Sequence, residues 1–515
     1  MDDAILKALW HFWLLGFACF MTFSAQSHAQ TYTSSVLPLP ENHTRQESTL
    51  FSTPNVPVRY SSAPGSNIVQ DKPQAWEPVV PSEACFSCND GSHRLPLMPY
   101  WDHGLHLISW DEQFNLHIGG NAQWDSVWLV GPMGVLGQPA SNATSTTNSA
   151  ASLPRRARFK ADGNIYQLFD FSIEFDFANA TNDNKGLQSP TQDNVADSAF
   201  PCNVWLQIRD VPFLGHIRIG NQVVPVGMTN NTYQGFLPFL ERADNMDGFY
   251  GPFDEGFDPG ISVINWTDSE RVTWRYGIFR PLKNAFGIGL DEYKVAGRVT
   301  ALPVYEEDGT ELIHVGFSMS QSSTVNNEFR LRARPLLRNG PGYAVPVLAD
   351  TTTLPGENEW IIGPELAAVY GPFTMQAEWT AALYQQVVAN GLNQGTVFFH
   401  GGYVQVLYFL TGEHQAYEKK EGVFGRVIPN RSLLFAKDAV SSWGAWQVGL
   451  RFSYLDLNDK AIDGGQIKDL TIGLNWFLNP NMKIQGNYLL AHRNGQQGAG
   501  DGWFSGFGVR AAFDF

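Results

Sequence analysis

Basic side chains recur at every second position in two short stretches of this sequence. Arg156, Arg158 and Lys160 alternate with apolar residues, and the run from Arg330 through Arg332 to Arg334 does the same. Side chains two positions apart project from the same face of a β-strand, so each stretch would form a ladder of positive charge. Guanidinium groups bind phosphate and carboxylate oxygens in pairs, whereas an ammonium group acts as a point charge. The two ladders therefore predict contacts with oxyanions.

Alternation of polar and apolar residues continues through most of the chain after residue 114. In residues 169–177 every odd-numbered residue is apolar and every even-numbered residue is polar or acidic. A strand of this kind has one dry face and one wet face, and many such strands predict an all-β fold. We find 17 such segments: 114–124, 155–163, 167–177, 204–210, 213–223, 260–267, 271–280, 294–302, 311–320, 327–334, 359–370, 372–384, 396–411, 443–457, 467–478, 481–491 and 504–515.

The composition is unusual for a water-soluble enzyme, although a water-soluble β-sandwich, which also alternates, is the alternative to a membrane barrel. Of the 515 residues, 16% are charged and 13% aromatic, whereas about 25% are charged in ordinary globular domains. No run of 18 apolar residues follows residue 30, and a closed antiparallel barrel is the other structure that spans a bilayer. About 25 residues per strand and connection over about 400 residues gives about 16 strands, with 18 as the alternative. Single-chain bacterial barrels have even strand numbers, so either at least one of the 17 segments is not a strand or two of them form a single strand.

The ends of the expected strands fit a porin-like transmembrane barrel. Aromatic residues stand near the ends of the dry faces, as in interfacial girdles; they include Trp360, Tyr370, Trp379, Tyr403, Trp446, Tyr454, Trp476 and Tyr488. The turns at 371–372 and 479–481 are tight, whereas the connections 225–259 and 412–442 are long. We expect the short turns at one end of the barrel and the long loops at the other.

The first 110 residues differ from the rest. Residues 8–23 are apolar, and Ser27-His28-Ala29 is a small-x-small cleavage pattern, which predicts a signal peptide over 1–29 and export of the chain. An uncleaved membrane anchor is the alternative. We expect a Pro/Ser/Thr-rich N-terminal extension over 30–110 and an outer-membrane β-barrel over 111–515.

The last strand, Gly506–Phe515, looks like the terminal strand that the barrel-insertion machinery reads in outer-membrane proteins. Further segments with distinctive motifs are Arg155–Arg158, Phe175–Phe177, Leu240–Arg242, Tyr408–His414, Gly422–Arg426 with Pro429, Trp446–Tyr454, Gly473–Trp476, Asn479-Pro480 and Asn487-Tyr488. Together these segments resemble the phosphate-selective porin O and P family of bacterial outer-membrane anion porins.

The resemblance implies a 16-stranded barrel in the cell outer membrane, usually a homotrimer, that passes small anions. Its solutes would be inorganic phosphate or other small anions, and outer-membrane lipid would surround it. No position here matches the central lysine of the family, which leaves phosphate specificity open. A general or non-selective diffusion porin is the alternative within this class, and a secreted β-rich carbohydrate-active or carbohydrate-binding protein is the alternative from another class.

The expected pore wall is more basic than the chain as a whole, whose net charge is −16. Each basic residue could instead be solvated or paired with a wet-face acid. We expect the anion-binding and pore-lining residues to be Arg155, Arg156, Arg158, Lys160, Arg209, Arg218, Arg271, Arg275, Arg298, Arg330, Arg332 and Arg334. The connection 225–259 is rich in acids; it would oppose anion passage if it folds into the lumen, and an external loop is the alternative.

We expect no catalytic residue, metal or cofactor. The sequence lacks the phosphate-binding, nucleophile-elbow and zinc-protease motifs, and its acidic balance argues against a nucleic-acid partner. Cys85 and Cys88 are more consistent with a local disulfide than with a zinc site. The side chains of His103 and His106 are expected to be solvated and not to bind a metal ion.

Overall fold

The computed structural model describes residues 97–136, 146–178, 199–250, 256–281, 292–339, 345–433, 442–496 and 500–515. The predicted signal peptide, most of the predicted extension, and Cys85 and Cys88 lie outside these residues. Within the described ranges, no helix is long and apolar enough to cross a membrane.

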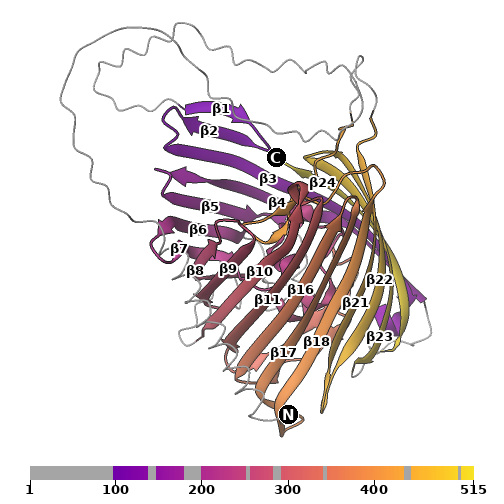
Figure 1. The fold of residues 1–515 in the computed structure, drawn as a ribbon. Coiled ribbons are helices and arrows are strands. Elements are labelled where there is room, and N and C mark those ends of the chain that lie inside the picture. Colours follow the sequence, from indigo (N-terminus) through magenta and orange to yellow (C-terminus); the bar gives the residue numbers. More distant parts are fainter. Residues whose placement is uncertain are drawn as a thin grey trace, which may run out of the picture. The chain divides into compact units, whose positions relative to one another are not determined.

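The main sheet has 18 strands among the described residues, and 16 of them close into an antiparallel barrel (Figure 1). This confirms the predicted fold class. The barrel strands are β3 (Phe114–Pro132), β4 (Thr146–Ile165), β5 (Phe169–Asp176), β6 (Phe200–Val211), β7 (Gly215–Val223), β8 (Phe257–Trp266), β9 (Val272–Phe279), β10 (Lys294–Glu306), β11 (Glu311–Ser323), β16 (Asn358–Tyr370), β17 (Phe373–Ala389), β18 (Leu392–Phe409), β21 (Ala445–Asp459), β22 (Ile462–Asn479), β23 (Met482–Gln496) and β24 (Gly502–Asp514).

The barrel closes where the last strand meets the first. Residues 505–514 of β24 pair with residues 121–130 of β3. Beyond this ladder, the Gly120 amide donates to the Phe515 carbonyl at 2.7 Å, and the Phe515 amide donates to the Gly120 carbonyl at 3.0 Å. Closure leaves the wall without the unpaired backbone groups that a bilayer core would not tolerate.

The alternation in the sequence sorts side chains to the two faces of the wall. In β5, Glu174 and Asp176 are buried inside the barrel, while Ile173 is 46% exposed on the outside. In β24, Phe507 and Phe513 likewise face outward. An apolar exterior around a polar interior is the arrangement that lipid requires.

Two details of the predicted wall are wrong. Tyr403, expected on the lipid face, points inward and is 4% exposed, because β18 runs in the opposite phase. Residues 327–334 do not form a wall strand. They contribute only β12 (Glu328–Phe329) and β13 (Arg332–Ala333), which pair with β15 (Leu354–Pro355) and β14 (Ala349–Asp350) in the connection between β11 and β16. Removing this segment from the 17 candidates leaves the 16 strands observed.

The two long connections do not leave the barrel at the same end, contrary to expectation. Strands alternate in direction, so every second connection lies at the same end. The connection 410–444, between β18 and β21, therefore shares its end with the tight turns 371–372 and 480–481 and with the C-terminus. The connection 224–256 leaves at the opposite end. We call the end with the tight turns and the C-terminus the turn end, and the opposite end the loop end.

A small hairpin extends the sheet at the turn end. It consists of β1 (Leu97–Trp101) and β2 (Leu105–Ser109), and residues 105–108 pair with residues 115–118 of β3. The hairpin pairs with the same edge of β3 as β24 does: β2 pairs with residues 115–118 and β24 with residues 121–130. It falls within the range that the sequence assigned to the N-terminal extension, so the sheet begins before residue 111.

We expect a methyl group at Gly120 to weaken closure. A Cβ there would lie 2.5 Å from the Arg158 carbonyl oxygen of β4 and 2.9 Å from the Phe515 ring, so β3 would have to shift away from β4 and the Phe515 ring would have to move at the seam. Gly120→Ala should destabilise the barrel by about 1–3 kcal/mol. The measurement is the temperature at which the folded band is lost on gels. Gly486→Ala is the control, because nothing lies within 4 Å of a Cβ there, and an equal loss in both variants would contradict the prediction.

Candidate functional site

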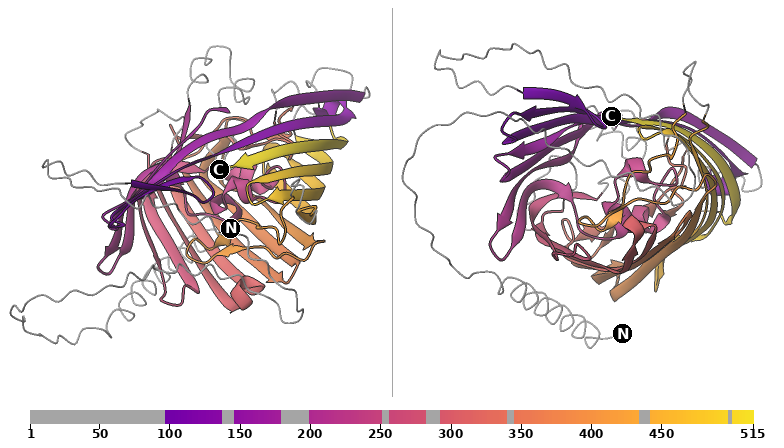
Figure 2. Two further views of the ribbon diagram at one scale, coloured as in Figure 1. Left: turned by 90° about the horizontal axis from the view of Figure 1, so that it is seen from above. Right: turned by 45° about the horizontal axis from the view of Figure 1, so that its top comes forward.

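Three connections fill much of the barrel interior. The constriction loop, residues 224–250, enters from the loop end and contains α3 (Met228–Asn231), the 3-10 turn η4 (Gln234–Phe236) and α4 (Asp244–Tyr250). The loop-end insert, residues 324–357, enters beside it. The turn-end hairpin, β19 (Tyr417–Glu418) with β20 (Val423–Phe424), enters from the other end. In the right-hand view of Figure 2, the magenta and orange pieces of these segments lie within the ring of strands.

The constriction loop therefore folds into the lumen and is not an external loop. Leu240 is fully buried against Val127, Leu336, Leu337 and other apolar side chains of the wall and the loop-end insert. These apolar contacts fix the loop and the insert to each other and to the wall.

A β-bulge in β4 brings two neighbouring arginines into the interior. Gln123 of β3 pairs with Arg156, and the next residue, Trp124, pairs with Pro154, which leaves Arg155 as the extra residue. Such a bulge redirects side chains that strict alternation would send to opposite faces. Arg155 and Arg156 are consequently both buried, with 7% and 2% of their surface exposed.

Glu241 of the constriction loop is the acceptor for this basic wall. Arg155 donates from Nε to Oε1 at 2.6 Å and from Nη2 to Oε2 at 3.1 Å. Nε of Arg338, in the loop-end insert, donates to Oε2 at 2.9 Å, and Nη2 of Arg510, on β24, lies 3.3 Å from Oε1. Arg156 Nη2 is 4.0 Å away. Burial alone would raise the pKa of Glu241, but the guanidiniums of Arg155, Arg338 and Arg156 hold it well below its ordinary value.

Most of the first predicted ladder is paired with carboxylates. Arg158 donates to Asp176 at 2.9 Å and lies 3.5 Å from Glu174, and Lys160 lies 3.1 Å from Asp162. The acids of the constriction loop are also partnered: Asp247 forms an ion pair with Arg338 and accepts the Arg334 amide at 2.8 Å. The acidic loop and the basic wall therefore largely neutralise each other.

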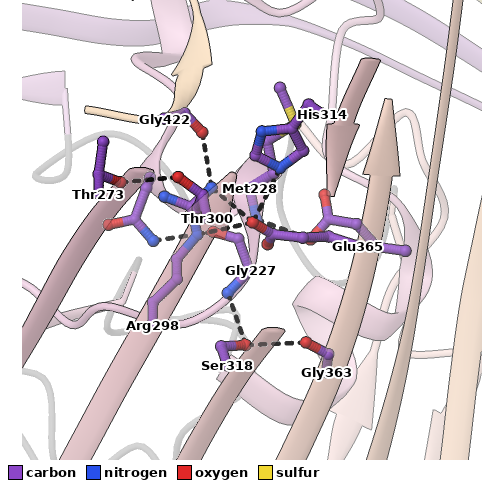
Figure 3. Close-up of polar contacts among 12 residues, drawn as sticks. Gly227, Met228, Thr273, Arg298, Thr300, His314, Ser318, Gly363, Glu365 and Gly422 are labelled. Carbon is purple, nitrogen blue, oxygen red and sulfur yellow. Dashed lines mark hydrogen bonds and ion pairs between the residues drawn. The ribbon is translucent and has the colours of Figure 1, made fainter. Parts of the chain in front are cut away.

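Arg298 anchors the turn-end hairpin to the wall (Figure 3). Its Nε donates to Glu365 at 2.9 Å, its Nη1 to the Glu421 carbonyl at 3.1 Å and its Nη2 to the Gly422 carbonyl at 2.7 Å. His314 lies beside the same carboxylate, with Nε2 at 3.1 Å from Glu365 and Nδ1 at 2.6 Å from the Tyr417 hydroxyl. These contacts are buried or partly buried, and they attach β19 and the turn between β19 and β20 to the wall.

The constriction loop is anchored to the adjoining strand. Glu378, which pairs across the sheet with Glu365, accepts the amides of Met228 at 2.9 Å and Thr229 at 2.8 Å. The Met228 side chain is fully buried and packs in one apolar cluster with Val423 and Phe424 of the turn-end hairpin. Segments from opposite ends of the barrel therefore meet on one stretch of wall.

Arg218 and Arg275 differ from the arginines above. Arg218, on β7, donates from Nε to the Gln207 side chain at 2.9 Å and lies 4.0 Å from the centre of the Trp205 ring. Arg275, on β9, donates from Nη2 to the Gln222 side chain and to the Val223 carbonyl, both at 2.8 Å, and its Nε has no partner. Among the described residues, neither has a carboxylate within ion-pair distance, although Glu421 acts on both guanidiniums electrostatically.

The remaining predicted site residues lie towards the ends of the barrel or off its wall. Arg209 donates to Asp170 at 2.8 Å, and Arg271, in the turn before β9, lies 3.5 Å from Glu306. Arg330, Arg332 and Arg334 belong to the loop-end insert, so they are not a ladder along a wall strand; Arg330 is half-exposed and donates to Asp350 at 2.8 Å. Arg338 is not among the residues predicted from the sequence, because a residue in an irregular connection has no periodic pattern to indicate it.

No group of three or more His, Cys, Asp or Glu side chains in the described ranges is placed to bind a metal ion. His106 is instead stacked between the rings of Tyr100 and His117.

Comparisons with known proteins give consistent matches. The family model described as "Phosphate-selective porin O and P" matches residues 137–515. An uncharacterized protein of Caulobacter vibrioides is 30% identical over 272 residues, which span 50% of each chain. Porin O of Pseudomonas aeruginosa is 21% identical over 419 residues, which span 75% of this chain and 85% of the relative.

Solved structures of low sequence identity also match. An anion-selective porin from Comamonas acidovorans matches at 11% identity and a TM-score of 0.42, covering 78% of this chain and 100% of that one. The outer membrane channel DcaP of Acinetobacter baumannii matches at 11% identity and a TM-score of 0.41, covering 78% and 97%.

We expect Glu241→Gln to release the constriction loop, because it removes the carboxylate that joins the loop to Arg155 of the wall, Arg338 of the loop-end insert and Arg510 of β24. Breaking a buried ion pair in this way costs about 3–5 kcal/mol. The measurement is protease cleavage within 224–256 of the folded protein, which should become faster. The control is Glu306→Gln, whose ion pair with Arg271 lies at the surface, with 61% and 42% of the two side chains exposed; equal cleavage rates in the two variants would show that Glu241 does not fix the loop.

Proposed function

Because the chain belongs to the phosphate-selective porin O and P family, we propose that this outer-membrane porin is a diffusion channel that prefers small anions. The family and the closed barrel with its apolar exterior support a channel over a secreted carbohydrate-active protein. The finer part of the proposal is the sign of the ion that the channel prefers.

The observation that supports anion preference is the state of Arg218 and Arg275. Arginines bound to carboxylates contribute little net field to the lumen, because each pair is close to neutral. Arg218 and Arg275 face the interior from β7 and β9 and have only neutral hydrogen-bond partners among the described residues. Unpaired charges on a low-dielectric wall attract counter-ions and set the selectivity of a pore. We propose that these two residues are the main anion contacts of the predicted set.

The solute and the assembly are also proposals. Inorganic phosphate is the first solute to test, because the family is described by its selectivity for it. Assembly as a homotrimer and delivery to the membrane through the strand that ends in Phe515 rest on the same family. A general diffusion porin would contain the same barrel and would differ in showing no preference for anions.

We expect the double variant Arg218→Gln/Arg275→Gln to lose much of the anion preference. A unit charge 4 Å from a passing ion is worth about 1 kcal/mol even in water and acts with opposite sign on anions and cations, so the anion-to-cation permeability ratio should fall roughly fivefold or more. The measurement is the reversal potential in planar bilayers under a salt gradient. The control is Lys468→Gln, which removes a positive charge from the outer face of β22. An unchanged ratio in the double variant would contradict the role of these residues.

A further inference from the structure

The tip of the turn-end hairpin, residues 419–422, lies against the inner wall at β9 and β10 (Figure 3). Gly422 permits this close approach. Its φ of +66° favours glycine, and a Cβ there would lie 2.7 Å from the hydroxyl oxygen of Thr300 and 3.3 Å from that of Thr273. These two hydroxyls are hydrogen-bonded to each other at 2.7 Å, across β9 and β10. The backbone of the tip therefore packs directly on the wall.

Arg298 fixes the tip at one position along this wall. As described above, its Nη1 and Nη2 donate to the carbonyls of Glu421 and Gly422 at 3.1 and 2.7 Å. Arg298 of β10 pairs in the sheet register with Arg275 of β9. Residues that pair in this way project from the same face of an antiparallel sheet. The backbone at Glu421 is therefore held on the luminal face beside the pair that contains Arg275.

The two lysines of the tip have partners at the rim of the barrel. Nζ of Lys419 lies 3.0 Å and Nζ of Lys420 lies 3.4 Å from the carboxylate of Glu270, in the turn between β8 and β9. Each ammonium group also faces an aromatic ring, at 5.2 Å and 5.0 Å from its centre. These contacts hold the positive charges of the tip at the rim, and the acid that follows them in the sequence is not paired with either lysine.

The Glu421 side chain is exposed and forms no ion pair with any described residue. Its charge acts instead on Arg218 and Arg275, which are both partly exposed. Arg275 is acted on by Arg218 as well. The three groups thus belong to one electrostatic cluster on the luminal side of the wall. Two guanidiniums and one carboxylate leave this cluster with one net positive charge.

We propose that Arg218, Arg275 and Glu421 together set the charge selectivity of the channel, and that Glu421 limits its preference for anions. The guanidiniums attract a passing anion and the carboxylate repels it, whereas a passing cation feels the reverse. The inference rests on the proposed anion channel and adds to it a residue that enters the lumen from the turn end. In the alternative, Glu421 is a structural residue that only balances charge within the folded barrel.

The test is a charge series at position 421 of the full-length protein, measured by the reversal potential in planar bilayers under a potassium chloride gradient. Glu421→Gln should raise the anion-to-cation permeability ratio about threefold. Glu421→Lys should raise it again by a similar factor, because each step adds one positive unit of charge. Glu421→Asp keeps the charge and should stay close to the wild-type ratio. Asp268→Asn removes an exposed acid from the turn between β8 and β9 at the same end and should change the ratio far less.

Each outcome decides between the two roles. A ratio that does not change in Glu421→Gln, or that changes equally in Asp268→Asn, would overturn the inference. Loss of the folded band on gels in Glu421→Gln, with folding kept in Glu421→Asp, would show that the charge is needed for the barrel to form and would assign the structural role. An anion-selective wild type that is insensitive to the charge at position 421 refutes this inference only, whereas a cation-selective wild type refutes the proposed function.

Discussion

The interior of this barrel depends on the pairing between one carboxylate and the guanidiniums around it. Glu241 would be costly to bury alone, and so would Arg155, Arg338 and Arg510, whereas together they satisfy one another. Because these residues come from the constriction loop, the first part of the wall, the loop-end insert and the last strand, their pairing joins segments that are distant in the sequence. The loop cannot leave the lumen without exposing several arginines to an uncompensated interior.

This constraint divides the arginines into two groups. Those bound to carboxylates, such as Arg158 and Arg298, fix the wall and the inserted segments, and their charges are largely cancelled. Arg218, Arg275 and Arg451 have only neutral partners within the described residues. A count of basic residues on the wet faces overstates the charge available to a passing ion, and the position of each carboxylate is needed to correct it.

The sequence allows the wall to be predicted well, because alternation is a local property. The faces of β5 and β24, and the even strand number, follow from residues such as Glu174 and Phe513 and from the rule that closed barrels need paired edges. The arrangement of the interior can be predicted from this alternation only in part. A short periodic run around Arg332 fits a two-residue hairpin as well as a wall strand, a bulge at Arg155 breaks the period, and the partners of Glu241 are set by tertiary contacts. Nothing local to Arg338 or Arg451 distinguishes a paired guanidinium from an open one.

The sign of the ion preference decides whether the open guanidiniums govern permeation. The most direct measurement is the reversal potential of the wild-type protein in planar bilayers that separate two potassium chloride solutions of different concentration. Unpaired arginines in the lumen predict a potential close to the equilibrium potential of chloride. A potential close to that of potassium would contradict this, and it would mean that the acids of the constriction loop outweigh the arginines of the wall.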